Sequence, residues 1–340
     1  MSKNNKKINC IIRADGDFKI GHGHLKRCFA LCELLNDYCN IFFFSKNIPN
    51  YIKNDLNRIN VKVISLPSMS QRDECLYIYN RLENFNLIII DGYHFNSNYD
   101  KFFYERKKKV ITIDDIFNRK FSSHVIINHA PLVFKKNYKN LTNSKLFLGL
   151  DYKIIQKCFY QKKIIDRSKY KYNIFVCLGS GTSHFLFKVK LINFLLGLSG
   201  LNKIFFIASK KHIFYQKFEN NENFKKLYIY ENITSKDIVR LMKKSRFGIC
   251  TASNIALESY TANLPMLLTY NADNHLNVYK GLTKSKVAIG IGKLHDLNLG
   301  KLNSKISRVQ EKDYIKKFIS ISKKTINLSS RKKLLKAILS

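Results

Sequence analysis

The chain has 340 residues, a hydrophobic fraction of 45% and a formal net charge of +36. The length is enough for two domains with separate cores, and the hydrophobic fraction excludes general disorder. No apolar run approaches the roughly 20 residues that cross a bilayer, and the polar, basic start lacks the apolar region of a signal peptide, so we expect a cytoplasmic protein without a membrane segment.

In the first 150 residues, short apolar runs alternate with helical patterns. The runs lie at residues 8–12, 41–44, 61–66, 87–90, 110–113 and 125–127. Near-continuous apolar runs of this length are typical of strands buried on both faces of a parallel sheet. Between the first two runs, apolar residues recur three or four apart from Leu25 to Leu35, which predicts a helix with one buried face.

A polar, basic stretch at 151–171 predicts a linker that contains one helix. A second alternating series follows, with strands expected at 172–178, 204–208, 227–230, 247–250, 266–269 and 287–289. Helices are expected at 182–196, 235–244, 254–262 and 274–284. The sequence therefore predicts doubly wound α/β domains at 1–150 and 172–305, with ligands at the carboxyl ends of the strands. The tail, 306–340, is predicted to form basic amphipathic helices.

The first chemical motif lies where the first strand gives way to a helix. It contains His24 as the candidate catalytic residue, with Arg13, Asp15, Gly21, Gly23 and Arg27 as candidate substrate-binding residues. The two glycines permit a tight turn and close approach of a ligand, and a helix start offers free backbone N–H groups. His24 would lie at that start beside Lys26 and Arg27, which favours the neutral imidazole that a general base requires. A lone histidine could merely cap the helix, but the glycines and the strand-to-helix context favour catalysis. We interpret His22 as a loop side chain.

Two further motifs follow strands of the second domain. The first is Gly179, Ser180, Gly181 and Thr182. Its spacing departs from the dinucleotide fingerprint and it lacks the Walker lysine, which leaves a generic phosphate cradle with Thr182 as helix cap. The second runs from Ala252 and Ser253 to Glu258 and Pro265. Its small residues let a pyrophosphate approach a helix start, and Glu258 could accept both ribose hydroxyls. A solvated surface glutamate is the alternative for Glu258.

The spacing of potential metal ligands predicts neither a metal nor a cofactor. Asp15 and Asp17 match an Asp-x-Asp pattern, but they lie in the first loop without a companion ligand. The 8 cysteines form no Cys-x-x-Cys pair, and several lie within strand-like runs, so we expect reduced core thiols.

In combination, these motifs resemble the family of UDP-2,4-diacetamido-2,4,6-trideoxy-β-L-altropyranose hydrolases of the pseudaminic acid pathway, which share the GT-B fold with the lipid II N-acetylglucosaminyltransferase. The likeness also includes Ala272–His275, the segment that ends in Asp91 and Tyr93, and Asp114–Asp115. It runs in order from about residue 8 to 285. Asn263 stands where relatives have glycine, the loop at Gly179 differs, and the tail lacks the usual Asp-Gly-x-Gly-x-x-Arg ending, which leaves the exact sugar open.

The resemblance implies an α/β, GT-B-like fold of two Rossmann-like domains facing across a cleft, the first for sugar and catalysis and the second for UDP. It implies hydrolysis of the anomeric C–O bond of a UDP-linked 2,4-diacetamido-2,4,6-trideoxy sugar with inversion, in a pathway that serves flagellin or surface-glycan glycosylation. His24 would position or deprotonate water, Tyr93 and Asn274 would hold the sugar, and Glu258 would bind the ribose.

Two alternatives stay open. A GT-B glycosyltransferase would share every UDP feature and differ only in passing the sugar to an acceptor. A nucleic-acid or polyanion-binding protein would explain the charge, but it would leave the motifs without a role. Lysine is scattered and abundant together with Asn, Ile, Phe and Tyr, as in AT-rich coding sequences, although some of the excess could attract a diphosphate. We therefore expect a monomer that binds a UDP-sugar and water, not nucleic acid.

Overall fold

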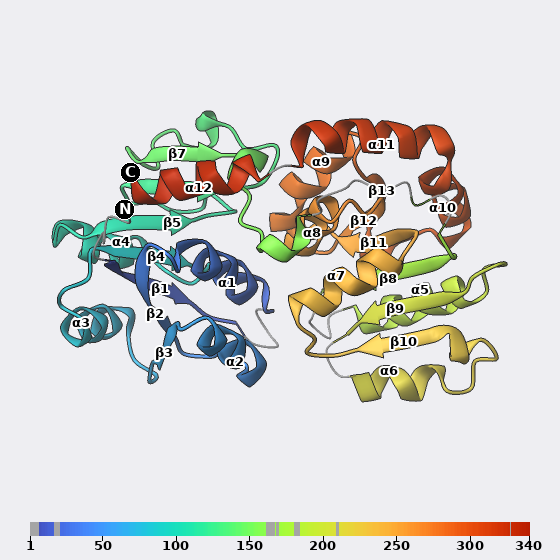
Figure 1. The fold of residues 1–340 in the computed structure, drawn as a ribbon, viewed down its shortest axis with the longest axis horizontal. Helices are drawn as coiled ribbons and strands as arrows, with labels where there is room; N and C mark the ends of the chain where they lie inside the picture. The colour runs from blue at the N-terminus through green and yellow to red at the C-terminus, as the bar shows by residue number, and fades with distance from the viewer. Residues whose placement is uncertain are drawn as a thin grey trace, which may run out of the picture. The chain divides into compact units, whose positions relative to one another are not determined.

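A computed structural model of the protein describes residues 7–16, 21–160, 167, 170–179, 184–208, 211–326 and 328–340. The chain forms two compact units (Figure 1), Met1–Gln156 with Ser329–Ser340, and Lys157–Leu328. Each unit contains one parallel sheet flanked by helices, which confirms the expected α/β class. In the described part of the chain, no helix is long and apolar enough to cross a membrane.

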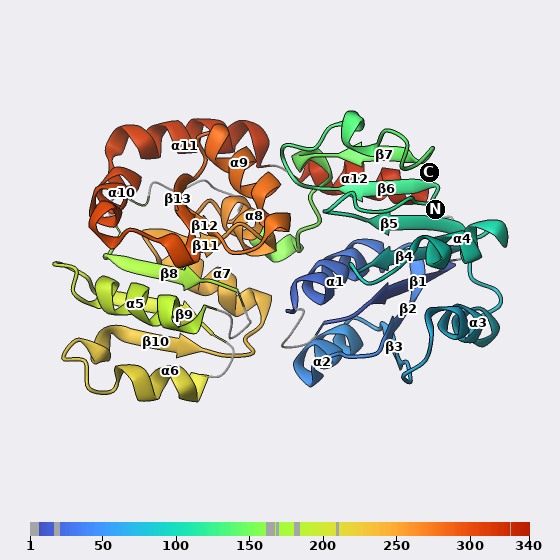
Figure 2. The same cartoon turned by 180° about the vertical axis from the view of Figure 1, so that it is seen from behind.

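The first unit is built on a seven-stranded sheet of order β3-β2-β1-β4-β5-β6-β7. Its strands are β1 Ile8–Ala14, β2 Cys39–Ser45, β3 Lys62–Ser65, β4 Leu87–Asp91, β5 Lys109–Ile113, β6 Val125–Asn128 and β7 Lys145–Leu148. Its helices are α1 Gly23–Leu35, α2 Asn50–Arg58, α3 Gln71–Arg81, α4 Ser97–Glu105 and α12 Ser329–Leu339. Figure 2 shows β5, β6 and β7 side by side at one edge.

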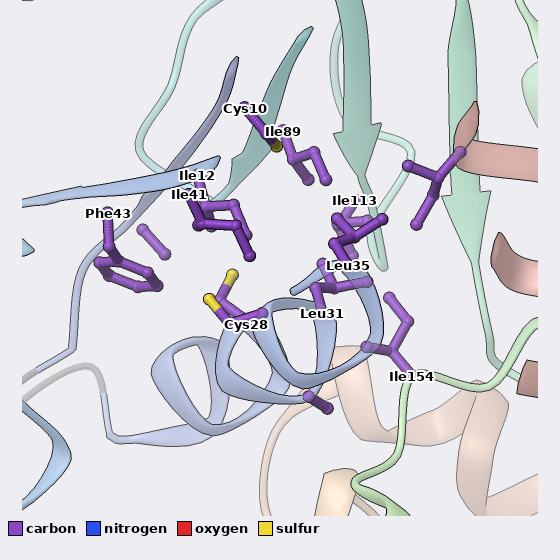
Figure 3. Close-up of a cluster of buried hydrophobic side chains, with 14 of the residues drawn as sticks. Cys10, Ile12, Cys28, Leu31, Leu35, Ile41, Phe43, Ile89, Ile113 and Ile154 are labelled. Carbon is purple, nitrogen blue, oxygen red and sulfur yellow. The ribbon is translucent and has the colours of Figure 1, made fainter. Parts of the chain in front are cut away.

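Alternation along the strands fills a core on each face of this sheet. In β1, Cys10, Ile12 and Ala14 pack beneath α1, α2 and α12, whereas Ile11 joins a second cluster beneath α3 and α4. In Figure 3, strand residues such as Cys10 and Ile12 lie opposite Leu31 of α1. Both faces are covered, which is why the strands appear in the sequence as nearly unbroken apolar runs.

The second unit has a six-stranded sheet of order β10-β9-β8-β11-β12-β13. Its strands are β8 Asn173–Cys177, β9 Lys203–Ile207, β10 Leu227–Tyr230, β11 Phe247–Thr251, β12 Met266–Tyr270 and β13 Ile289–Lys293. Its α-helices are α5 Phe185–Leu196, α6 Lys211–Phe218, α7 Ser235–Lys244, α8 Asn254–Thr261, α9 Leu276–Lys284, α10 Leu302–Gln310 and α11 Lys312–Thr325. One core lies beneath α5, α6 and α10. Buried Arg167 donates to backbone carbonyls at the ends of α7 and α8, where helix dipoles favour a cation.

The end of the chain is divided differently from our expectation of one separate tail at 306–340. α10 and α11 belong to the second unit, whereas α12 returns to the first. Leu334 and Ile338 of α12 enter the core beneath α1. Lys153 Nζ donates to Ser330 Oγ at 3.2 Å, and Arg331 donates to the carbonyl of Ile155 at 2.8 Å. Apolar burial and these polar contacts thus fix α12 on the first unit.

Candidate functional site

Strand order in the first unit brings three polar segments together. β1 lies beside β4, and β4 lies beside β5, with Ala14 opposite Asp91 and Asp91 opposite Ile113. Because the strands are parallel, the segments that leave their carboxyl ends meet at one edge of the sheet. α1 follows β1 at this edge, Asp91 ends β4, and Asp115 lies just after β5.

Asp91 is fully buried and accepts hydrogen bonds from the face of α1 that turns toward it. Its Oδ1 lies 2.7 Å from His24 Nδ1 and 2.6 Å from Arg27 Nη2, and its Oδ2 accepts from Arg27 Nε at 2.8 Å. Cys28 Sγ lies 3.5 Å from the same Oδ2. Burial alone would raise the pKa of Asp91, but attraction to Arg27 and His24 outweighs burial and lowers that pKa below its usual range. Asp91 is therefore an ionised acceptor.

The carboxylate of Asp91 determines which nitrogen of the His24 imidazole carries the hydrogen. An ionised carboxylate can only accept, so in the neutral imidazole the hydrogen lies on Nδ1 and the lone pair on Nε2. A base that is oriented by a carboxylate in this way also gains stabilisation when it becomes an imidazolium. The side chain of His24 is 7% exposed. The arrangement can therefore take a proton from a water molecule that reaches Nε2.

Arg27 and Asp115 extend the site to Tyr93. Arg27 Nη1 donates to both oxygens of Asp115 at 2.9 and 2.8 Å, and the Tyr93 hydroxyl donates to Asp115 Oδ2 at 2.9 Å. The phenol ring of Tyr93 meets the imidazole of His24 edge-on, with 4.5 Å between the ring centroids. His24, Asp91, Arg27, Asp115 and Tyr93 thus form a closed ring of contacts, which we call the His24 ring.

When His24 is neutral, two carboxylates and one guanidinium give the His24 ring a net charge of −1. Burial alone would raise the pKa of Asp115, but attraction to Arg27 outweighs it and lowers that pKa. The pKa of Arg27 is raised by Asp115 and Asp91, against the lowering effect of burial. A proton that arrives on His24 would therefore neutralise the group, which suits a residue that becomes positively charged during a reaction.

Arg13 and Asp15, which we predicted as substrate-binding residues, are buried and engaged inside the first unit. Arg13 Nε donates to Glu74 Oε1 at 2.6 Å and Nη2 donates to Asp15 Oδ2 at 2.7 Å. Glu74 also accepts from the Tyr99 hydroxyl at 2.6 Å and pairs with Lys46 Nζ at 2.8 Å. These residues join β1, the end of β2 and α3, so they support the edge of the sheet from within.

The glycine turn before His24 is described in part. Gly21 has φ of 84°, a conformation that favours glycine, whereas a Cβ on Gly23 would meet nothing. His22, expected in the loop, is the N-cap of α1 and contacts the Tyr51 hydroxyl at 2.9 Å. The alternative that His24 caps the helix is therefore wrong. Asp17 lies outside the described residues. Within the described residues, no group of three or more Asp, Glu, His or Cys side chains could hold a metal ion.

In the second unit, the predicted UDP residues follow β8, β11 and β12. Gly179, with φ of 85°, comes just after β8, and Ser180, Gly181 and Thr182 lie outside the described residues. Ser253 is the N-cap of α8, and buried Ala252 precedes it. Asn274 lies in a 3₁₀ turn, Asp273–His275, after β12.

Glu258 is 3% exposed and accepts from Asn254 Nδ2 at 2.8 Å, so the alternative of a solvated surface glutamate is wrong. Asn263 has φ of 56°, a left-handed backbone conformation that asparagine tolerates better than most residues. Binding of a nucleotide by the predicted residues of this unit stays a prediction.

Sequence reasoning placed His24, Arg27 and Tyr93 in the site, but it gave Asp91 and Asp115 no role. A signal was present, because each follows an apolar run that ends at the same edge of a parallel sheet. The carboxylates could be paired with α1 only once the order β1-β4-β5 was known.

Comparison with solved structures shows that the chain has a GT-B-like fold. The chain superposes on MurG of Acinetobacter baumannii over 97% of its own length and 99% of that chain, with a TM-score of 0.65 and 12% identity. It superposes on UGT71G1 of Medicago truncatula, complexed with UDP-glucose, over 100% of both chains, with a TM-score of 0.67 and 14% identity. At these identities the likeness shows the fold alone.

Sequence similarity to a curated relative gives more specific information than the likeness in fold. The chain is 27% identical over 266 residues, 74% of its length and 88% of the relative, to the UDP-2,4-diacetamido-2,4,6-trideoxy-β-L-altropyranose hydrolase of Campylobacter jejuni. This similarity confirms the resemblance that the motifs indicated. No family model matches the chain.

Proposed function

We propose that the protein hydrolyses the anomeric C–O bond of a UDP-linked 2,4-diacetamido-2,4,6-trideoxy sugar, with inversion, and releases UDP and the free sugar for pseudaminic acid biosynthesis. The pairing of His24 with Asp91 at 2.7 Å is the observation that carries the proposal. The similarity to the Campylobacter jejuni hydrolase supports the choice of substrate.

In this mechanism, His24 Nε2 takes a proton from water while the water oxygen forms a bond to C1 of the sugar. The bond between C1 and the diphosphate oxygen breaks, and its electron pair leaves with UDP. Asp91 keeps the Nδ1 hydrogen of His24 in place and stabilises the imidazolium, which afterwards returns its proton to solvent. Tyr93, held by Asp115, and Asn274 orient the sugar in this proposal.

The second unit grips UDP in this proposal, through the loop that begins at Gly179 and the helix start at Ser253, with Glu258 on the ribose. UDP is already a good leaving group, and backbone N–H groups can stabilise its growing charge. We therefore propose that turnover needs no divalent cation. The rate after exhaustive EDTA treatment checks this point, and a loss of activity that Mg²⁺ restores would contradict it.

Oxygen labelling tests the reaction itself. The protein is incubated with UDP-linked 2,4-diacetamido-2,4,6-trideoxy sugars in H₂¹⁸O without any acceptor, and products are followed by NMR and mass spectrometry. Cleavage at C1 places ¹⁸O on the free sugar and none on UDP, and inversion gives one anomer first. Label on UDP, or no release of sugar, would contradict the proposal.

A GT-B glycosyltransferase is the second candidate, because the same fold occurs in a glycosyltransferase of Rickettsia africae at a TM-score of 0.63. The two functions differ in the molecule that attacks C1. Adding alcohol and sugar acceptors to the labelling experiment separates them. Transfer to an acceptor at the expense of ¹⁸O-labelled sugar would favour the transferase.

A further inference from the structure

Four basic side chains gather at the carboxyl end of the sheet in the second unit. His184 is the residue before α5, and Lys188 lies one turn into that helix. Lys293 ends β13, and His295 follows it in a 3₁₀ turn, Leu294–Asp296. Ligands of doubly wound sheets bind at this end of the strands. We call these four residues the basic cluster.

The two imidazoles of the basic cluster are stacked. Their ring centroids are 5.3 Å apart and their planes differ by 12°. His184 has φ of 59°, in the left-handed region that histidine rarely adopts. Burial, together with the charges of His295, Lys188 and Lys293, lowers the pKa of His184. The fold therefore holds the two rings face to face although the surrounding charges oppose protonation of His184.

Lys188 adds a buried ammonium group beside the pair. It is 3% exposed and donates to the carbonyl of Gly179 at 3.3 Å. Burial lowers its pKa to about 8. A bound anion would stabilise the charged form of this buried lysine, because attraction to the anion offsets the cost of desolvating the ammonium group.

In the described part of the chain, His295 of the basic cluster pairs with one exposed carboxylate. Asp296 lies 3.6 Å from His295 Nε2, but its side chain is 67% exposed. His295 Nδ1 is buried without a hydrogen-bond partner in the described part of the chain. A group of basic side chains in which His295 carries an unsatisfied ring nitrogen is suited to a multivalent anion.

We propose that the basic cluster binds the diphosphate of a nucleoside diphosphate and that the stacked pair His184 and His295 takes up a proton when it binds. The inference rests on the proposed function, which supplies UDP as the ligand. In the free protein the lowered pKa of His184 keeps its imidazole neutral near neutral pH. The bound diphosphate brings negative charge next to the pair, so protonation becomes favourable and the positive pair holds the diphosphate. Nucleotide binding then weakens as pH rises.

Calorimetric titration tests the inference at about pH 5.5 and about pH 7.5, on either side of the histidine range. UDP, inorganic pyrophosphate and uridine are titrated in two buffers of different ionisation enthalpy, which gives the number of protons taken up. The test variant is His184→Asn with His295→Asn, because Asn tolerates the left-handed backbone at 184. Lys190→Ala, an exposed position of the same helix, is the charge control. Thermal unfolding verifies that each variant is folded.

Wild type should take up a proton with UDP and with pyrophosphate, but not with uridine. The double variant should lose this uptake and bind both anions roughly tenfold more weakly at the lower pH, whereas Lys190→Ala should behave as wild type. The terminal phosphate of UDP itself ionises at about pH 6. Each variant is therefore compared with wild type at the same pH. Unchanged uptake and affinity in the double variant would overturn the inference. The two proposals can also fail separately. If the double variant loses pyrophosphate binding but wild type does not hydrolyse the UDP-sugar, the inference stands and the proposed function is rejected.

Discussion

Asp91 is the residue on which the His24 ring depends, because it orients His24 and also pairs with Arg27. Asp91→Asn keeps the shape of the side chain but removes its charge. The imidazole of His24 then loses its preferred tautomer, and a proton on this imidazole loses its counter-charge. We expect turnover to fall roughly 10²- to 10⁴-fold while UDP affinity changes little, as for other carboxylates that orient a catalytic histidine.

Steady-state kinetics and calorimetry on the same preparation measure both quantities. Asp55→Asn, which removes a carboxylate from a surface pair with Arg58, serves as the control and should leave turnover unchanged. Turnover of Asp91→Asn within tenfold of wild type would contradict the orienting role.

At the scale of elements, the ends of β1 and β2 are tied to α3 by buried charges. Arg13 and Lys46 both pair with Glu74, which is 1% exposed. Burial alone would raise the pKa values of Asp15 and Glu74, but hydrogen bonds and attraction from Arg13 and their other partners lower both. Lowered values in the folded state stabilise the fold above about pH 4, and this contribution disappears as pH falls further.

Glu74→Gln removes part of that contribution. We expect the free energy of unfolding of the first unit to fall by about 3 kcal/mol at neutral pH, since one partner of a buried pair is lost. The difference from wild type should shrink as pH is lowered below about 4, where Glu74 itself becomes protonated. Urea unfolding across this pH range measures it, with exposed Glu83→Gln as control. A difference that is independent of pH would refute the electrostatic explanation.

α8 is the element proposed to present ribose-binding and phosphate-binding groups together. A carboxylate that accepts two ribose hydroxyls contributes about 1.5–3 kcal/mol, or roughly 10- to 150-fold in affinity. We therefore expect Glu258→Ala to weaken UDP binding by that factor. Glu258→Gln, which keeps the packing of this buried residue, should weaken binding less. Calorimetric titration with UDP decides, and wild-type affinity in Glu258→Ala would make the residue structural.

The elements differ in how far the sequence predicts them. β4 and β11 are mostly apolar and buried at every residue, and the apolar pattern was enough to locate them. β7, a four-residue strand at the edge of the sheet with no fully buried residue, was missed. α6, which begins directly after residues outside the described part, was missed as well. Glycine spacing located His24, but its pairing with Asp91 depends on strand order, which no local pattern contains.

At the scale of the whole molecule, the last helix returns to the unit that holds the His24 ring. The basic, amphipathic pattern of α12 predicted a helix but could not indicate which core it covers. Leu334 is 2% exposed in the core of the first unit. Leu334→Ala should therefore destabilise that unit by about 2–5 kcal/mol, whereas exposed Lys332→Ala should change stability by less than about 0.5 kcal/mol.

Hydrogen exchange resolves the two units separately. In Leu334→Ala, amides of β1 and β2 should exchange faster, while those of β8 and β11 in the second unit keep their wild-type rates. Faster exchange confined to the second unit would contradict the assignment of α12 to the first.

His24 is proposed to activate the attacking water, and turnover of His24→Asn with a UDP-linked 2,4-diacetamido-2,4,6-trideoxy sugar tests this role most directly. Asn has no basic ring nitrogen, so the oriented base is lost while the second unit, which is proposed to hold UDP, is untouched. We expect kcat to fall by at least ~100-fold, with UDP affinity close to that of wild type. Near-normal kcat in His24→Asn, measured on protein that binds UDP normally, would contradict the account.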